Sequence, residues 1–337
     1  MIANVERNGA RVGITGIGAS VPDRVLTNED LERMVETSDE WIVERTGIRE
    51  RRIAEAGEAT SDLAVPAAEE ALERASVRAR EIDLLIVATA SPDMLFPSTS
   101  CLVQDRIGAR NAAAYDLLAG CTGFVYALAQ AYGAIAAGLA DRALVVGAEV
   151  LSKLTNWRDR GTCILFGDGA GAAVLERVPA GGFLGFELGA DGSGGEDLAV
   201  PAGGTRAPAT RATLEQDLHF IRMNGREVYR FATRIMVSSA EALLEACGYG
   251  VDDVDLYVAH QANKRIIDHA ARILGLPPEK VVVNIDRYGN TSSASIPICL
   301  VEALEGGAIA NGTRVFMTGV GAGLTWGSAY MVWSDGR

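Results

Sequence analysis

The stretch EIDLLIVATAS, residues Glu81–Ser91, has a counterpart later in the chain, DVDLYVAHQAN, residues Asp253–Asn263. In both stretches an Asp-Leu pair opens a short apolar run, and each stretch follows an Ala- and Glu-rich segment typical of a helix. Asp83 corresponds to Asp255, which sets the offset between the copies at 172 (255 − 83). Internal repeats of this kind indicate a duplicated architecture.

The same offset (319 − 147) relates Gly147 in ALVVGAE to Gly319 in RVFMTGVGAG. It also places RVGITGIGAS over FLGFELGADG. Each half alternates short β-branched runs with Ala-rich helical segments, which is typical of layered α/β units with mostly parallel, buried strands. We therefore predict two similar α/β halves, residues 1–178 and 179–337, packed together. Residues 151–165 form a loop-rich insertion that has no counterpart in the second half.

Composition and charge exclude several classes of protein. With 337 residues, 48% of them hydrophobic, the chain can bury one large core or two fused cores. A formal net charge of −13 argues against generic nucleic-acid binding, which needs a basic surface to displace counterions. The N-terminal stretch carries charge where a signal peptide needs an apolar segment. We therefore expect a cytoplasmic protein that binds neither nucleic acid nor membranes.

Five cysteines, scattered and without a C-x-x-C pair, suggest neither a disulfide framework nor a zinc site. One of them, Cys121, lies between Gly120 and Gly123 just before an Ala-rich helical segment. The positive end of a helix dipole favours a thiolate, so this position predicts a nucleophile with a lowered pKa. The other four are predicted to be buried packing residues: Cys101, Cys163, Cys247 and Cys299.

Two further polar residues are placed to join Cys121. His260 ends the repeated strand, and Asn290 lies in RYGNTSSASIP, the loop that the repeat offset pairs with the cysteine loop. Equivalent loops at the carboxyl ends of strands meet in a duplicated α/β protein, so the three side chains are predicted to converge. The alternatives are a structural histidine and an asparagine that only caps a helix.

Glycine-rich segments could suggest a nucleotide. GITGIG, GDGAGAA and GADGSGG all lack the spacing of a dinucleotide or P-loop fingerprint. We interpret them as tight turns and close strand packing.

Six motifs, in chain order TSDEWIVERTGIRERR, AGCTGF, LFGDGAGAAVL, HQAN, GNTSSAS and GAGLTWGS, resemble the β-ketoacyl-acyl-carrier-protein (ACP) synthase III family of the thiolase superfamily. The resemblance covers nearly the whole chain. It implies the α/β thiolase fold, in which two duplicated halves form an αβαβα layered sandwich. It also implies an acyltransferase, a condensing enzyme that initiates fatty-acid biosynthesis, and a homodimer.

The chemistry implied by this resemblance is a decarboxylative Claisen condensation without a metal or cofactor. Cys121 takes an acyl group from a short acyl-CoA, such as acetyl-CoA, and passes it to malonyl-ACP to give a 3-ketoacyl-ACP. His260 and Asn290 hydrogen-bond the malonyl thioester oxygen, and the N–H groups of Cys121 and Ala322 hold the oxyanion. Phe124 supplies an apolar surface that disfavours the malonate carboxylate, and Phe96 ends the acyl pocket across the dimer.

The resemblance also assigns the two substrate-binding surfaces. Coenzyme A is expected to contact Thr37, Trp41, Arg45, Arg160, Gly225 and Asn263. ACP is expected on a basic surface that includes Arg230, Lys264, Arg265 and Arg272. Arg222, Arg226, Arg230 and Arg234 are spaced by four residues and would form one stripe on a helix. The alternative is an ordinary solvated face with ion pairs to residues such as Glu227.

Two other functions remain open from the sequence. One is a secondary-metabolite acyltransferase on the same scaffold, which would share the Cys-His-Asn set. The other is a non-catalytic partner subunit, and such subunits typically lose the nucleophile that Cys121 supplies here. Thiolases with a second cysteine and elongating synthases with a second histidine do not fit the three residues.

Overall fold

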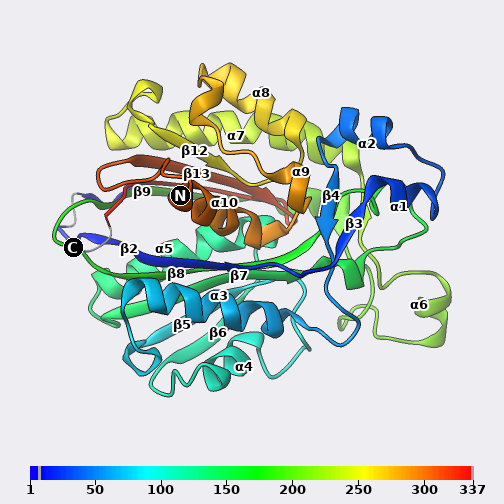
Figure 1. Cartoon of the computed structure of the whole chain (residues 1–337), viewed down its shortest axis with the longest axis horizontal. Coiled ribbons are helices and arrows are strands. Elements are labelled where there is room, and N and C mark those ends of the chain that lie inside the picture. The colour runs from blue at the N-terminus through cyan, green and yellow to red at the C-terminus, as the bar shows by residue number, and fades with distance from the viewer. Residues whose placement is uncertain (7–8, 335–337) are drawn as a thin grey trace.

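The computed structural model of the chain describes residues 1–6 and 9–334, which form two mixed five-stranded sheets between layers of helices (Figure 1). The first sheet has the order β2-β8-β7-β5-β6. Its strands are β2 (Val12–Ser20), β8 (Asp168–Arg177), β7 (Arg142–Val150), β5 (Leu84–Ala88) and β6 (Ala113–Leu117). The second sheet has the order β1-β9-β14-β13-β12, with β1 (Ile2–Asn4), β9 (Gly182–Ala190), β14 (Thr325–Val332), β13 (Arg314–Gly321) and β12 (Leu256–Ala259).

Helices form three layers around these sheets. In Figure 1, α3 (Thr60–Ala75) and α4 (Thr99–Arg106) cover the outer face of the first sheet. Between the sheets lie α5 (Gly123–Ala136) and α10 (Ser295–Glu305). The outer face of the second sheet carries α7 (Gly225–Cys247) and α8 (Lys264–Leu274). The fold is therefore the predicted αβαβα sandwich.

The duplication is confirmed by element boundaries. Strands β5 and β12 begin at Leu84 and Leu256, and helices α5 and α10 begin at Gly123 and Ser295; both pairs keep the offset of the repeat (256 − 84 and 295 − 123). The expectation of mostly parallel strands is wrong, because β8 and β14 each pair antiparallel to both of their neighbours. A strand that is buried on both faces is a continuous apolar run whether it pairs parallel or antiparallel to its neighbours. The sequence pattern therefore does not show the direction of pairing.

The predicted division at residues 178 and 179 falls in the connection between β8 and β9 and stays a proposal. Strand β1 belongs to the first of these ranges but pairs with β9 of the second sheet. The insertion after β7 contains the short 3₁₀ helix Leu151–Leu154 and a series of turns, whereas β13 and β14 are joined by a three-residue hairpin loop, residues 322–324.

Smaller elements border one end of the sandwich (Figure 1). Strands β3 and β4 form one two-stranded antiparallel sheet, β10 and β11 form a second, and short helices lie beside them. Their bounds are β3 (Val25–Thr27), β4 (Glu50–Arg52), β10 (Leu198–Ala199), β11 (Arg222–Met223), α1 (Asn28–Glu32), α2 (Asp39–Thr46), α6 (Arg211–Glu215) and α9 (Ile285–Tyr288).

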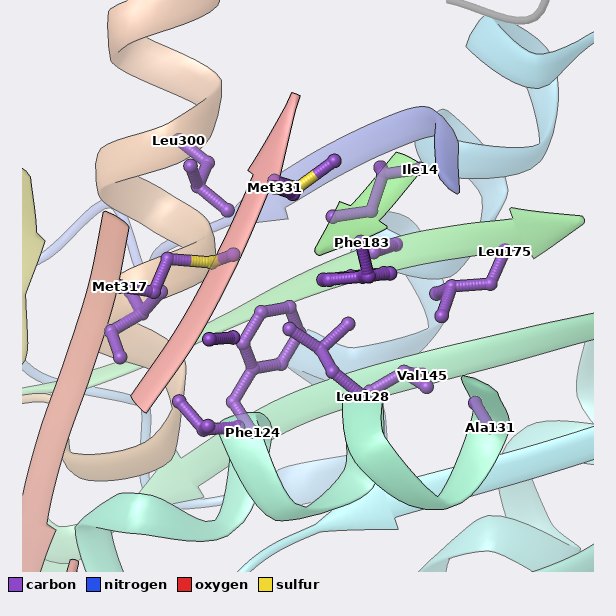
Figure 2. Close-up of a cluster of buried hydrophobic side chains, with 14 of the residues drawn as sticks. Ile14, Phe124, Leu128, Ala131, Val145, Leu175, Phe183, Leu300, Met317 and Met331 are labelled. Carbon is purple, nitrogen blue, oxygen red and sulfur yellow. The ribbon is translucent and has the colours of Figure 1, made fainter. Parts of the chain in front are cut away.

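The core between the two sheets joins the halves. Figure 2 shows Phe124 and Leu128 of α5 among side chains of both sheets, including Val145 of β7 and Met317 of β13, with Leu300 of α10 nearby. All five side chains are fully buried. Burial of a large apolar side chain contributes roughly 1.5–3 kcal/mol, so this layer holds the two sheets in a fixed relation.

Glycines allow the helix on the outer face to approach the first sheet closely. A Cβ at Gly16 or Gly18 of β2 would clash with the carbonyl oxygens of Ala71 and Ala67 on α3. The interpretation of GITGIG as a packing motif is therefore confirmed.

Candidate active site

Cys121 lies in the 3₁₀ helix Gly120–Thr122, which leads directly into α5. Its side chain is buried, and α5 lies between the two sheets. The predicted helix after the cysteine is confirmed, and it places the cysteine at the boundary between the two halves.

Two loops, one from each half, meet at this cysteine with their backbones in contact. Gly120 has φ +53°, and a Cβ there would lie 2.7 Å from the backbone nitrogen of Ala322. A Cβ at Gly321 would lie 2.5 Å from the backbone nitrogen of Cys121. Glycine at both positions therefore lets the N–H groups of Cys121 and Ala322 lie close together, the arrangement that an oxyanion hole needs.

His260 follows β12 directly, as predicted, and is 1% exposed. Its Nδ1 lies 2.7 Å from the Ser295 hydroxyl, and the backbone N–H of Gln261 donates to that hydroxyl at 3.3 Å. A serine hydroxyl that already accepts one hydrogen bond can donate its proton to Nδ1, which leaves the imidazole proton on Nε2. His269, a second histidine, lies within α8 and outside the lining of the cavity.

Hydrogen bonds of both its backbone and its side chain hold Asn290 in place. Its N–H donates to the Leu165 carbonyl at 2.8 Å, and its carbonyl accepts the Gly167 N–H at 3.0 Å. Its Oδ1 accepts the Ser292 N–H at 2.9 Å. The side chain therefore does cap the turn, and its amide NH₂ is the end that remains available to a ligand.

The three predicted side chains converge. Cys121, His260 and Asn290 line one cavity of about 100 Å³. The rest of the lining is mainly apolar and includes Phe231, Val320 and Leu324, with Gly225 and Asn263 also present. A buried cavity with a thiol, an imidazole and an amide in apolar walls is an arrangement suited to acyl transfer.

A second cavity, of about 340 Å³, also begins at Cys121. Its walls are mostly apolar and include Leu118, Leu151, Leu154 and Ala322. Two of these residues belong to the insertion after β7, so the loop-rich insertion forms part of a hydrophobic chamber beside the thiol.

Burial changes the ionisation of the site. It raises the pKa of Cys121 to about 12, with the nearby Glu149 carboxyl raising it further and a Ser292 hydrogen bond opposing it. The expected lowered pKa is therefore wrong for this state, because desolvation exceeds the effect of the helix end. Burial also lowers the pKa of His260 to about 3. At neutral pH the pair is a thiol beside a neutral imidazole.

Three of the residues expected to contact coenzyme A lie together around the Trp41 ring, and a fourth links them to the lining of the first cavity. The guanidinium carbons of Arg45 and Arg160 each lie 4.7 Å from the centre of the Trp41 ring. Asn263 donates from its side chain to the Arg45 carbonyl at 3.0 Å, which joins the cluster to the cavity lining. The Thr37 hydroxyl oxygen is buried without a partner among the described residues. Trp41 is partly exposed.

The basic residues expected to bind ACP lie on α7 and α8 and are exposed. Arg230 pairs with Glu227 at 2.6 Å, and Lys264 pairs with Asp268 at 2.6 Å. Arg265 lies over the Tyr229 ring at 5.6 Å, and Arg272 contacts His269. The predicted four-arginine stripe is wrong at one end, because Arg222 lies in β11 and α7 begins at Gly225.

Phe96 is 83% exposed and lies outside both cavity linings of its own chain, so its expected role across a dimer stays a proposal. Two other sequence predictions need correction. Phe124 is fully buried in the core and lies outside the linings of both cavities, so the apolar wall near the thiol comes from residues such as Val320. Cys101 is exposed, whereas the other cysteines are buried.

Sequence reasoning missed Glu149 and Ser292. Glu149, at the end of β7, is fully buried, and Ser292 is 2% exposed with a φ of +49°. A carboxylate in the apolar run ALVVGAEV was the available signal for Glu149, since a buried charge is rare without a partner or a function. No comparable signal marked Ser292 among the neighbouring hydroxyl residues.

None of the helices within residues 1–6 and 9–334 is long and apolar enough to cross a membrane.

Comparisons with known proteins agree on one family. The family model "3-Oxoacyl-[acyl-carrier-protein (ACP)] synthase III" matches residues 115–192, and the model of its C-terminal part matches residues 244–333. A curated β-ketoacyl-[acyl-carrier-protein] synthase III of Symbiobacterium thermophilum is 57% identical over 323 residues, 96% of this chain and 98% of the relative.

Solved structures give the same result. The β-ketoacyl-[acyl carrier protein] synthase III of Thermus thermophilus is 50% identical, has a TM-score of 0.89, and is matched over 96% of this chain and 100% of that one. A priming β-ketosynthase from the R1128 polyketide pathway is 34% identical with a TM-score of 0.90, over 97% of this chain and 98% of that one.

Proposed function

The chain belongs to the β-ketoacyl-ACP synthase III family, and on this premise we propose that Cys121, His260 and Asn290 carry out its reaction. The protein is an acyltransferase that initiates fatty-acid synthesis by condensing an acyl-CoA with malonyl-ACP. The observation that carries the assignment of residues is that all three side chains line one cavity.

In the first half-reaction, Cys121 attacks the acyl-CoA thioester. The tetrahedral oxygen accepts hydrogen bonds from the N–H groups of Cys121 and Ala322, whose backbones Gly120 and Gly321 bring together. Preorganised donors of this kind contribute roughly 2.7–4 kcal/mol each to the stability of the transition state. The acyl chain then occupies the apolar cavity beside the thiol.

In the second half-reaction, His260 and Asn290 bind the malonyl thioester oxygen. Ser295 at Nδ1 favours the tautomer with a proton on Nε2, and the occupied Oδ1 of Asn290 directs its NH₂ to the ligand. These donors stabilise the enolate that forms when CO₂ leaves. The apolar wall that includes Val320, Leu324 and Phe231 solvates the malonate carboxylate poorly and so promotes its loss.

Coenzyme A binds, in this proposal, at the Trp41 cluster. Arg45 and Arg160 flank the indole and can contact adenine and phosphate, while the pantetheine passes Gly225 and Asn263 toward Cys121. ACP docks on the exposed basic residues Arg230, Lys264, Arg265 and Arg272, because the carrier is acidic and this otherwise acidic chain offers cations there.

The protein works as a homodimer through the face that carries Phe96. Leu95 and Phe96 are at least 80% exposed, and Leu118 is 75% exposed beside the edge strand β6. The Phe96 loop leads into α4, whose first N–H groups donate to Asp116 of β6, so the loop lies next to that edge. Leu118 also lines the acyl cavity, so a partner that covers this face would lie beside the cavity. This supports the proposal that the partner's Phe96 closes the cavity and favours short acyl chains such as acetyl. The proposed location is the cytoplasm.

A mass measurement tests the assignment. After incubation with acetyl-CoA, the wild-type chain should gain one acetyl group on Cys121, the Cys121→Ser variant should gain none, and the matched buried-thiol control Cys247→Ser should gain one. His260→Ala and Asn290→Ala should still be acetylated but should lose malonyl decarboxylation. Equal loss of acetylation in Cys121→Ser and Cys247→Ser would refute Cys121 as the nucleophile.

A further inference from the structure

Arg51, in the middle of β4, is a fully buried arginine to which the reaction proposed above assigns no role. Within residues 1–6 and 9–334, its guanidinium group forms no ion pair with a carboxylate. Burial lowers the pKa of Arg51 to about 10, and Cys163 and Glu50 oppose this shift, so the side chain is a cation at neutral pH. A buried cation without a paired carboxylate is costly, so its hydrogen bonds have to compensate for the lost water.

The guanidinium group of Arg51 joins two segments of the chain. Its Nη1 donates to Oδ1 of Asn28 at 2.9 Å and to the Leu26 carbonyl at 3.2 Å. Its Nη2 donates to the Ile164 carbonyl at 2.8 Å. All three acceptors are carbonyl oxygens that lie on two sides of the group. The planar fork of an arginine, with donors on separate nitrogens, therefore fits them better than a single ammonium group would.

The first segment leads to the residues expected to bind coenzyme A. Asn28 is 1% exposed, and its Nδ2 donates to the Asp39 carboxylate at 2.8 Å. Asp39 is the first residue of α2, the helix that carries Trp41 at the centre of the expected coenzyme A cluster. Arg51 is thus connected through one side chain to the start of that helix.

The second segment, residues 164–167, holds the catalytic asparagine in place, and we call it the strap. The Leu165 carbonyl accepts the Asn290 N–H at 2.8 Å, and the Gly167 N–H donates to the Asn290 carbonyl at 3.0 Å. Leu165 lines the same cavity as Asn290. The carbonyl to which Arg51 donates belongs to the residue before Leu165, so Arg51 holds the strap next to its contacts with Asn290.

The base of the Arg51 side chain also packs against the strap and the loop of Asn290. A Cβ added at Gly167 or at Gly289 would lie 3.2 Å from the Arg51 Cβ. Gly289 directly precedes Asn290, so β4, the strap and this loop are in close contact. Close-packed interiors transmit displacements, so a change at Arg51 is expected to move the Asn290 amide.

We propose that Arg51 is a positioning residue for the condensation step, which fixes the strap that orients Asn290 and links it to the start of the coenzyme A helix. The inference rests on the proposed function, because it needs Asn290 as a donor to the malonyl thioester oxygen. The alternative is an arginine that only stabilises the fold. A stabilising role alone predicts a lower free energy of unfolding without a selective loss of the second half-reaction.

Three substitutions and one control separate these roles. Arg51→Met removes the donors but keeps an unbranched apolar stem, and Arg51→Lys keeps the cation but has only one donor nitrogen. Asn28→Asp keeps an acceptor for Arg51 and loses the donor to Asp39, so it breaks only the link to α2. The control is Arg52→Met on the same strand, because Arg52 is partly buried and donates to the Pro22 carbonyl at 3.4 Å instead. Thermal unfolding measures the stability of each variant.

The first readout is malonyl-ACP decarboxylation, with kcat and KM measured separately. We expect Arg51→Met and Arg51→Lys each to lower kcat by about a hundredfold with little change in KM, because a displacement of about 1 Å in a catalytic arrangement costs that much. Both variants should still be acetylated on Cys121, with a raised KM for acetyl-CoA, because that step does not use Asn290. Asn28→Asp should keep the wild-type kcat for decarboxylation and raise KM for acetyl-CoA about fivefold, the effect of one lost hydrogen bond. Arg52→Met should match the wild type in both reactions.

The second readout is a double-mutant cycle with Asn290→Ala. If Arg51 acts through Asn290, adding Arg51→Met or Arg51→Lys to Asn290→Ala should slow decarboxylation no further. Losses that multiply in the double variant, or a folded Arg51→Lys with the wild-type kcat, would overturn the proposal. Arg51→Lys keeps the buried charge, so it decides the matter if Arg51→Met does not fold. An Asn290→Ala variant that decarboxylates malonyl-ACP at the wild-type rate would instead refute the proposed function.

Discussion

Replacing Gly120 with alanine tests the contact that builds the oxyanion hole. The new Cβ would lie 2.7 Å from the backbone nitrogen and 3.1 Å from the carbonyl oxygen of Ala322. An ordinary contact begins near 3.4 Å, so the hairpin loop with Ala322 must move by about 0.7 Å. Displacements of about 1 Å in a catalytic arrangement cost roughly a hundredfold in rate, which is the loss of self-acylation we expect for Gly120→Ala.

Gly138 provides a matched control. It also has a positive φ, +73°, but a Cβ there meets nothing within 4 Å. Both substitutions carry the strain of a left-handed alanine, about 1–2 kcal/mol, while only Gly120→Ala adds overpacking of roughly 1–3 kcal/mol. Rapid-quench acylation with acetyl-CoA and urea unfolding would measure the two effects. Wild-type acylation by a folded Gly120→Ala, or equal loss in Gly138→Ala, would refute the backbone contact as the origin of the oxyanion hole.

Three other predictions concern acid stability, carrier docking and assembly. Because burial lowers the pKa of His260 to about 3, the unfolded chain takes up a proton below pH 6.5 that the folded chain does not, and the free energy of unfolding should fall by about 2 kcal/mol between pH 6.5 and 5. Urea unfolding of His260→Gln should show a smaller fall in the free energy of unfolding over that range. A fall equal to that of the wild type would contradict a buried, neutral His260. Charge reversal at Arg265 and Arg272 should raise KM for malonyl-ACP about fivefold, while the rate of self-acylation by acetyl-CoA stays unchanged. The wild-type KM for malonyl-ACP should rise as the salt concentration passes about 0.15 M. If KM responds to neither change, the two arginines are solvated surface residues that do not bind ACP. Phe96→Asp should convert a dimer to a monomer in size-exclusion chromatography, and an unchanged elution volume would place the dimer interface elsewhere.

Several features of the fold and site could be predicted from the sequence. The internal repeat placed the two halves in register, because strands and helices in both copies keep the same local apolar patterns. Cys121 and His260 were found because each lies where a local pattern changes, one before a helix and the other after a strand. Asn290 followed from the repeat, which paired its loop with the cysteine loop. Apolar patterns, helix starts and strand ends are all set by short segments of the chain, so the sequence shows them directly.

Properties that depend on several distant segments were mispredicted or missed. Phe124 follows the nucleophile closely in the sequence, yet it points into the core between the sheets (Figure 2), and Val320 of the other half lines the cavity. The helix end alone predicted a thiolate at Cys121, but enclosure by both halves makes desolvation the larger effect and raises its pKa. Ser293 and Glu149 come from different halves of the chain, and the Ser293 hydroxyl lies 3.0 Å from a Glu149 oxygen only because the α/β halves close on each other. The sequence by itself determined the duplicated architecture and which three residues to examine, because local patterns encode both. Tertiary packing decided which side chains are removed from water and which of them line the cavities at Cys121, because burial and ionisation are set by all the segments around a side chain.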